Sequence, residues 1–343
     1  MIRNIPTAEE LRSSAIELLV MAWEAAVATF ALLEDSEIEI WDTDGSALAD
    51  YHAAQQPALR HAHVWVHQAQ ELGLKANIAA ISPYILLAGD PRSWPRPGPN
   101  GEIEFNDFRT IDASDLIRVH DTVCNQTLPP DFIRKFDEAR RSRNKIVHLG
   151  GRGVAADATG IFVGVLETVE SLFPQHRWAR YLMDAALNDP VAIAHGQGAE
   201  AGLLASFAIV AKVLPPAMVR RHFGYDKRRR SYICLSCSTD EKDWKDPSRF
   251  AQLTTPDSDQ LFCPVCAVVY DVLREPCAEG SCRSDVLCGS GYEVGKCLLC
   301  MRVDAARFED QARIWLRGRA DALESVPVEP PDIPSPPADG HPA

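Results

Sequence analysis

The sequence predicts a mainly α-helical protein, a bundle of four or five helices followed by a small Cys-rich zinc-ribbon domain. Apolar residues recur at helical spacing through most of the N-terminal half. The cysteines gather instead in closely spaced pairs after residue 230. Five ranges are expected: a helical domain (1–190), a helix and basic linker (191–230), a zinc-ribbon-like region (231–302), a further helix (303–325) and a disordered tail (326–343).

Composition and charge limit the possible classes of protein. Hydrophobic residues make up 46% of the chain and charged residues 24%, as in soluble globular proteins. A net charge of −13 argues against coating nucleic acid through bulk electrostatics, so any nucleic-acid contact must be local. Ten cysteines without a recognisable signal sequence indicate a reducing, cytoplasmic location. The apolar stretch 15–33 contains Glu17 and Glu24, which favours a core helix over a membrane anchor, so no membrane partner is expected.

The first helices follow from local signals. Thr7 and Glu10 form a capping box that predicts a helix to about Leu33. Pro57 predicts the start of a second helix, which would end at Leu72. The third helix expected covers residues 77–87, and the Pro- and Gly-rich stretch 88–110 predicts a loop with a short strand at 103–105.

Three polar residues of the second predicted helix, His63, His67 and Glu71, are spaced i, i+4, i+8. This spacing would suit a metal ion. On an Ala- and Gln-rich surface, however, we expect the three side chains to be solvated.

The most clearly delimited helix spans residues 129–149. Two prolines open it and Gly150-Gly151 end it. Its apolar stripe has Arg143 along the middle, and a guanidinium there needs a counter-ion, a cleft or a subunit interface. The stripe consists of Phe132, Phe136, Ala139, Ile146 and Val147. The helix before it starts at Asp112 or Ser114. Asp115 is the carboxylate expected to orient Arg143, with Asp112, Asp121 and Asp137 as alternatives.

The segment Arg143 to His148 resembles the R-N-x-x-x-H signature of the HEPN superfamily (higher eukaryotes and prokaryotes nucleotide-binding). The resemblance covers roughly residues 1–190 and implies a HEPN-like bundle. Many members of that family are metal-independent ribonucleases of toxin–antitoxin, CRISPR and antiviral systems, with two motifs facing each other across the cleft of a homodimer.

For this chain the resemblance implies an endoribonuclease with RNA as substrate, acting as a toxin or antiviral-defence effector with an antitoxin or defence-system partner protein. The catalytic residues would be Arg143, Asn144 and His148, and Arg140, Arg141 and Lys145 would contact RNA. The alternative is an ordinary amphipathic helix with a solvated basic flank.

The rest of the bundle and a basic segment follow. Residues 159–173 and 176–188 predict two helices, and the Ala-rich stretch 190–213 predicts one buried or interface helix. Between Lys212 and Arg230 the chain carries seven basic residues against one acid. Arg228, Arg229 and Arg230, with Phe223 and Tyr225 interleaved, suit phosphates and unstacked bases, although a solvated linker has the same composition.

The cysteine spacing predicts two zinc ions per chain. The pairs Cys234-x2-Cys237 and Cys263-x2-Cys266 match one tetrahedral site. The ligands of the second would be Cys277, Cys282, Cys297 and Cys300, with Cys288 as a possible substitute for Cys277. The region resembles tandem zinc ribbons. All-cysteine sites leave no open position for a catalytic water, so the zinc would be structural. Cys124, alone in a helix, is expected to be an inert thiol.

Two functions remain open from sequence. In the first, a HEPN-type endoribonuclease, Arg143 neutralises the scissile phosphate, His148 acts as general acid or base, and Asn144 orients His148 or the phosphate. In the second, the chain is a non-catalytic adaptor that binds nucleic acid or protein. The complete Arg-Asn-His set favours the enzyme, whereas the acidic charge and the structural zinc favour the adaptor.

Overall fold

The computed structural model describes residues 1–98, 100–151, 153–188, 199–238, 248–289 and 293–303. Its described part is mainly helical, as predicted, and also contains an antiparallel sheet. The chain forms two compact units: unit 1 comprises Met1–Gln252 and Phe262–Val268, and unit 2 comprises Leu253–Leu261 and Val269–Ala343. The predicted helix 303–325, but for its first residue, and the predicted tail 326–343 lie outside the described residues.

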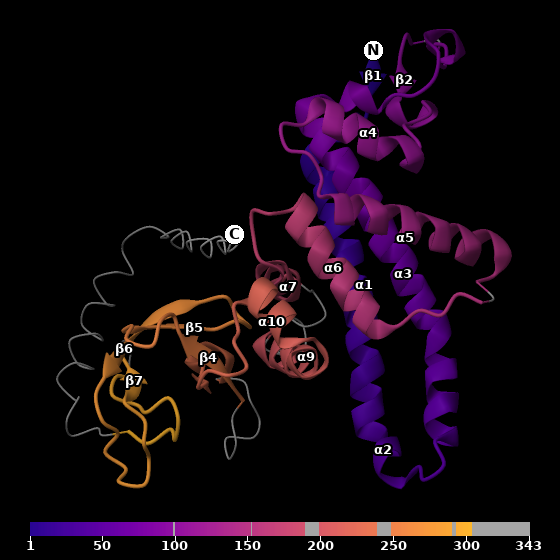
Figure 1. Cartoon of the computed structure of the whole chain (residues 1–343). Coiled ribbons are helices and arrows are strands. Elements are labelled where there is room, and N and C mark those ends of the chain that lie inside the picture. Colours follow the sequence, from indigo (N-terminus) through magenta and orange to yellow (C-terminus); the bar gives the residue numbers. More distant parts are fainter. Residues whose placement is uncertain (99, 152, 189–198, 239–247, 290–292, 304–343) are drawn as a thin grey trace, which may run out of the picture. The chain divides into compact units, whose positions relative to one another are not determined.

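Unit 1 is built on a long helical hairpin. Helix α1 (Ala8–Ser36) is followed by the short α2 (Ile38–Trp41), and α3 (Ser46–Ile81) returns alongside α1 (Figure 1). The predicted capping box is confirmed, since Glu10 N–H donates to Thr7 Oγ1 at 3.1 Å and Thr7 N–H donates to the Glu10 carboxylate at 2.8 Å. By length and composition α1 could also cross a membrane. Here its residues Leu19, Ala22 and Trp23 are buried.

The two separate helices predicted after Pro57 are wrong, because α3 runs without interruption through Pro57 to Ile81. Pro57 and Ala53 are both exposed, so water can bind the Ala53 carbonyl that the proline leaves without a donor. The partner helix α1 supports α3 along its length. A 3-10 turn, η1 (Pro83–Leu86), follows. Gly73 lets α6 approach α3, since a Cβ there would lie 2.7 Å from the Phe173 ring.

The segment after α3 pairs with the N-terminus. Strand β1 (Ile2–Arg3) is parallel to β2 (Ile103–Glu104), within the range where a strand was predicted. Two further 3-10 turns, η2 (Pro91–Ser93) and η3 (Phe105–Asp107), flank β2. Helix α4 (Ala113–Val123) then begins after Asp112, whose side chain makes no capping hydrogen bond.

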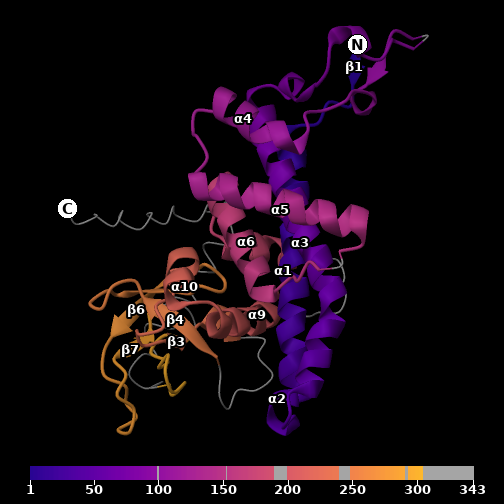
Figure 2. The same cartoon turned by 45° about the vertical axis from the view of Figure 1, so that its right-hand side comes forward.

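The next three helices agree closely with prediction. They are α5 (Pro130–Leu149), α6 (Ala158–Leu172) and α7 (Trp178–Leu187). Gly150 ends α5 in the left-handed region at φ 68°. Figure 2 shows α5 crossing the α1–α3 hairpin. The core of unit 1 contains an aromatic group in which the Trp23 ring centroid lies 4.6 Å from that of Phe162 and 5.5 Å from that of Trp178.

The basic segment from Lys212 to Arg230 is not a solvated linker, because part of it forms a helix with buried side chains. Helix α9 (Ala199–Val213) is followed by α10 (Pro216–Phe223), and residues 190–198 of the predicted helix lie outside the described residues. In α10, Val219 and Phe223 are fully buried. Tyr225 contacts Phe207 with ring centroids 5.5 Å apart. These aromatic side chains therefore pack in the core of unit 1 and are not free to stack on bases.

The C-terminal strands are hydrogen-bonded in chain order, β3-β4-β5-β6-β7. Their bounds, with the short helix α11, are β3 (Tyr232–Ile233), α11 (Leu235–Ser238), β4 (Arg249–Leu253), β5 (Gln260–Phe262), β6 (Val269–Arg274) and β7 (Val286–Cys288). Strands β3 and β4 are antiparallel with an irregularity in register, and β6 and β7 are antiparallel with Leu273 opposite Leu287.

Candidate metal centres and a polar helix crossing

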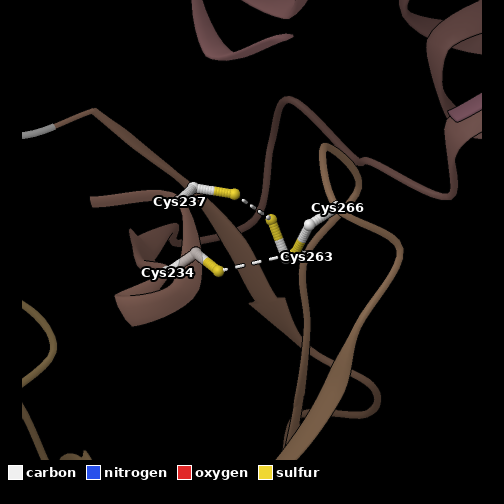
Figure 3. A group of neighbouring side chains, drawn as sticks. All are labelled: Cys234, Cys237, Cys263 and Cys266. Carbon is white, nitrogen blue, oxygen red and sulfur yellow. Dashed lines mark hydrogen bonds between the residues drawn. The ribbon is translucent and has the colours of Figure 1, made fainter. Parts of the chain in front are cut away.

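The first cysteine group lies within unit 1. Cys234 lies between β3 and α11, Cys237 lies in α11, and Cys263 and Cys266 come from the loop after β5 (Figure 3). All four side chains are buried, and their sulfur atoms lie within 4.8 Å of one another. The Sγ atoms of Cys234 and Cys266 are 3.7 Å apart, and those of Cys237 and Cys263 are 3.8 Å apart.

These separations fit a tetrahedral zinc ion. Four sulfurs at a Zn–S distance of about 2.3 Å lie about 3.8 Å from one another. A disulfide would need about 2.05 Å, so the pairs are not disulfides. The pKa values of these thiols are shifted in opposite directions. Hydrogen bonding with Cys237 lowers the pKa of Cys234, and the same interaction raises the pKa of Cys237. A stabilised thiolate is the form that binds metal.

The second group, Cys277, Cys282, Cys297 and Cys300, lies in unit 2 and also meets the geometric condition for a metal. Cys277 and Cys300 Sγ are 3.6 Å apart, and Cys282 and Cys297 Sγ are 3.8 Å apart. Cys277 thus belongs to this group, and Cys288 is buried in β7 outside it. Burial differs sharply from the first group, because Cys300 is exposed and Cys277 and Cys282 are half-buried.

The predicted catalytic residues lie on the second half of α5, which is less buried than the first. Phe132 and Phe136 are buried, whereas Val147 is 52% exposed and Leu149 74% exposed. Arg143 and Asn144 are half-buried, and Arg143 Nη1 donates to Asn144 Oδ1 at 3.1 Å. Asn144 therefore contacts Arg143. His148 is exposed in the last turn. The apolar stripe expected from sequence is a core face only up to its middle.

None of the carboxylates proposed from sequence pairs with Arg143. Each has another partner: Asp115 binds Arg118, Asp112 binds Arg109, Asp121 accepts from the Leu128 N–H and lies beside His120, and Asp137 binds Arg140 and Arg141. Among the described residues no carboxylate oxygen lies within 4.0 Å of an Arg143 nitrogen. The expectation that Asp115 orients Arg143 is therefore wrong. Asp115 and Arg118 are three residues apart on α4, a spacing at which two side chains of one helix readily form an ion pair.

The three polar residues of α3 expected on the surface are largely buried where α5 crosses. The His67 side chain is 1% exposed and Glu71 13%, with His67 Nδ1 3.3 Å from Glu71 Oε1. The His67 ring stacks on Phe136 at 5.1 Å. His63 Nε2 and both ring nitrogens of His67 are buried without a hydrogen bond. We call His63, His67 and Glu71 of α3, together with Arg140 and Arg143 of α5, the α3–α5 cluster.

Electrostatics in the α3–α5 cluster favour neutral histidines. Burial, together with the positive charge of Arg143, lowers the pKa of His67 to about 4. Burial also lowers the pKa of His63, against the effect of the Ala139 carbonyl. For Glu71, burial raises the pKa while Lys75 and Arg143 lower it. His63, His67 and Glu71 do not converge as a metal site among the described residues, where the cysteine groups alone meet that condition.

The remaining predicted RNA-binding residues have different environments. Arg140 and Arg141 pair with Asp137, Lys145 is exposed, and the guanidinium of Arg230 lies 6.0 Å from the Tyr232 ring centroid. The Arg228 side chain is exposed and Arg229 half-buried. Burial raises the pKa of the Cys124 thiol, which fits the expected inert cysteine.

Comparison with known proteins gives no relative: no family model matches the chain, and neither a curated protein nor a solved structure does.

Proposed function

We propose that the protein is a metal-independent endoribonuclease of the HEPN type. The observation that carries the proposal is the state of Arg143. Arg143 is half-buried, has no carboxylate at ion-pair distance among the described residues, and lies on the helix whose last turn exposes His148. A positive charge held without a counter-ion at a protein surface suits an anionic ligand.

The chemistry that this arrangement supports is internal transesterification. The 2′-oxygen of the RNA attacks the adjacent phosphorus as His148 removes the hydroxyl proton, and the bond from phosphorus to the 5′-oxygen breaks. The leaving 5′-oxygen takes a proton, giving a 2′,3′-cyclic phosphate and a 5′-hydroxyl. Arg143, aligned by Asn144, stabilises charge on the phosphate oxygens. No metal is required because the nucleophile belongs to the substrate.

We expect the same helix, α5, to form the interface of a homodimer. One arginine and one histidine are few for phosphodiester cleavage, and Val147 and Leu149 leave apolar surface exposed beside them. A two-fold homodimer would cover these residues and bring two motifs together. A monomeric mass at micromolar concentration would count against this composite site. An antitoxin or other defence-system partner protein would be the restraining factor for such a nuclease.

The second candidate is an adaptor without catalytic activity, and the two all-cysteine groups together with the net charge of −13 favour it. Its nucleic-acid contact would use the exposed Arg228 and Arg230. Replacing Arg228, Arg229 and Arg230 by alanine would then weaken RNA binding and reduce its salt dependence. For the ribonuclease, the same change would leave the rate of the chemical step unaltered.

The deciding experiment is RNA cleavage by the purified protein in excess EDTA. Arg143→Ala and His148→Ala should each lower the rate on the order of 10²-fold or more. The matched control is Arg134→Ala, which removes an exposed arginine of the same helix that already pairs with Glu138. Cyclic-phosphate ends should appear on RNA, and DNA should stay intact. Full activity of His148→Ala would overturn the proposal.

A further inference from the structure

We propose that Cys277 and Cys300 of the second cysteine group are a peroxide-reactive pair: hydrogen peroxide oxidises them to a disulfide, and a zinc ion bound to the group is released. This modification is independent of the proposed RNA cleavage, because it involves no residue of α5. Only the sulfur atoms change oxidation state, since Zn²⁺ has no redox chemistry of its own.

The sulfur atoms of Cys277 and Cys300 lie close enough to be joined by a small movement. Their Sγ atoms are 3.6 Å apart. The S–S bond of a disulfide is about 2.05 Å long, so the two atoms need to approach by about 1.5 Å. The Sγ atoms of Cys282 and Cys297 form the other close pair, at 3.8 Å. Distance alone therefore allows either pair to form a disulfide.

Solvent access separates the two pairs. Cys300 is exposed and Cys277 is half-buried, whereas Cys297 is fully buried in a small core with Leu287 and Val294. Oxidation of a cysteine increases with its thiolate character and its exposure. A metal ion keeps every sulfur that it binds in the thiolate form, so exposure decides the order within the group. Cys300 is therefore the sulfur that peroxide reaches first.

Backbone N–H groups hold the sulfurs of this group in place. The Glu279 N–H donates to Cys277 Sγ, and the Leu299 N–H donates to Cys297 Sγ, both at 3.5 Å. Hydrogen bonds of this kind orient ligand atoms around a metal. The bond from Glu279 also keeps Cys277 beside Cys300, where it can react with an oxidised Cys300.

The oxidation takes two steps. The Cys300 thiolate attacks one oxygen of hydrogen peroxide, the O–O bond breaks, and Cys300 becomes a sulfenic acid as hydroxide leaves. The Cys277 thiolate then attacks the Cys300 sulfur, the S–O bond breaks, and a second hydroxide leaves. Two thiolates are thereby oxidised to a disulfide, and one peroxide is reduced to two hydroxide ions. The group retains two of its four thiolates, which is too few to hold Zn²⁺.

The two cysteine groups should therefore respond differently to the same oxidant. All four cysteines of the first group are buried, so peroxide reaches them slowly. In unit 2, Cys277 and Cys282 pack against the small core that contains Cys297. Loss of zinc should loosen this core, because the metal links all four cysteines around it. Unit 1 should keep its structure.

The test treats the full chain, loaded with zinc, with hydrogen peroxide and a coloured zinc chelator too weak to remove zinc by itself. We expect one zinc ion per chain to be released at least about 10-fold faster than any further zinc. Alkylation and mass spectrometry should find a disulfide between Cys277 and Cys300, with the first cysteine group still reduced. A thiol reductant with added zinc should restore the bound metal.

Two variants sharpen the test. Cys300→His keeps four zinc ligands, since Cys3His sites also bind zinc, but it cannot form the disulfide and should retain its metal in peroxide. Cys124→Ser removes a thiol outside both groups and should release zinc as wild type does. Hydrogen exchange of the Leu298 N–H, which donates to the Val286 carbonyl at 3.1 Å, should become faster after oxidation of wild type.

Three outcomes would overturn the proposal. They are failure of the second cysteine group to bind zinc in the reduced chain, retention of its zinc in peroxide, and a first disulfide that does not include Cys300. Each is read from zinc content or from the mass of the cysteine peptides, and none depends on whether the protein cleaves RNA.

Discussion

Unit 1 contains two clusters of buried polar side chains that are built in opposite ways. In the first cysteine group, four buried sulfur atoms lie within 4.8 Å of one another, and one tetrahedral ion would satisfy all of them. In the α3–α5 cluster, both ring nitrogens of His67 are buried without a hydrogen bond, and Arg143 has no carboxylate at ion-pair distance among the described residues. A single ion could bind all four sulfur atoms of the first cluster, whereas the His67 nitrogens of the second cluster have no hydrogen-bond partner.

The difference separates stabilising from functional chemistry. A closed site contributes its binding free energy to folding. Buried polar groups without partners cost stability, so their presence in a packed helix crossing indicates a role other than stability. The comparison therefore predicts how strongly each cluster affects the unfolding of unit 1.

The largest expected effect is that of Cys263→Ser. Metal binding of a four-cysteine site contributes about 10 kcal/mol or more to folding, which is comparable with the whole stability of a domain. The variant should lose one zinc per chain and should not show the cooperative thermal unfolding of wild-type unit 1. Elemental analysis and calorimetry provide the measurement. Cys124→Ser, at a half-buried thiol outside both groups, is the control and should change stability by about 1 kcal/mol at most.

A smaller effect should follow from pH. The pKa of His67 is about 4 in the folded chain and 6.5 ordinarily, so the unfolded chain binds the extra proton between these values. Stability is then fully present above pH 6.5 and falls as the pH drops, by about 2 kcal/mol between pH 7 and pH 5. The lowered pKa values of His63 and His222 act in the same direction, and the raised pKa of Glu71 opposes it.

The measurement for this pH effect is urea unfolding of wild type and His67→Gln at both pH values, with zinc in the buffer. The variant should lose most of the difference attributed to His67. An identical pH dependence in the two proteins would show that His67 is not held neutral by the helix crossing.

A still smaller effect is expected for His67→Leu. The change removes two buried nitrogens that make no hydrogen bond but keeps an apolar side chain against Phe136, so the free energy of unfolding should stay within about 1 kcal/mol of wild type. Phe136→Ala provides the contrast and should cost about 3 to 5 kcal/mol. Denaturant titration measures both. If His67→Leu lowered the free energy of unfolding as much as Phe136→Ala does, the α3–α5 cluster would be stabilising, and the contrast with the first cysteine group would be wrong.

The smallest effect on unit 1 should come from loss of zinc from the second cysteine group in unit 2, caused either by Cys300→Ser or by a chelator. Because Cys300 is exposed and Cys277 and Cys282 are half-buried, a chelator should remove zinc from this group before it removes zinc from the buried first group. Native mass spectrometry after brief chelation should show a one-zinc protein whose unit 1 unfolds at an unchanged temperature. Simultaneous release of both ions would contradict the contrast in burial.

Local rules were sufficient for several features of this protein. The capping box at Thr7, the glycine that ends α5 and the spacing of the cysteine pairs each depend on residues within one turn or one loop, and the structure agrees with them. The helical class of the N-terminal half follows from periodicity in the same way. The RNA-cleaving role of Arg143 and His148 stays a prediction from a six-residue resemblance.

Tertiary structure decided what depends on residues far apart in the chain. The crossing of α5 buried His67 and most of Glu71, which on an isolated helix would be solvated, and Asp115 paired with Arg118 and not with Arg143. Packing along α1 carried α3 through Pro57. Three-dimensional convergence of sulfur atoms selected Cys277 over Cys288 as a member of the second cysteine group. Burial and the convergence of ligands are non-local quantities, because they depend on which surfaces meet, and one-dimensional spacing does not contain that information.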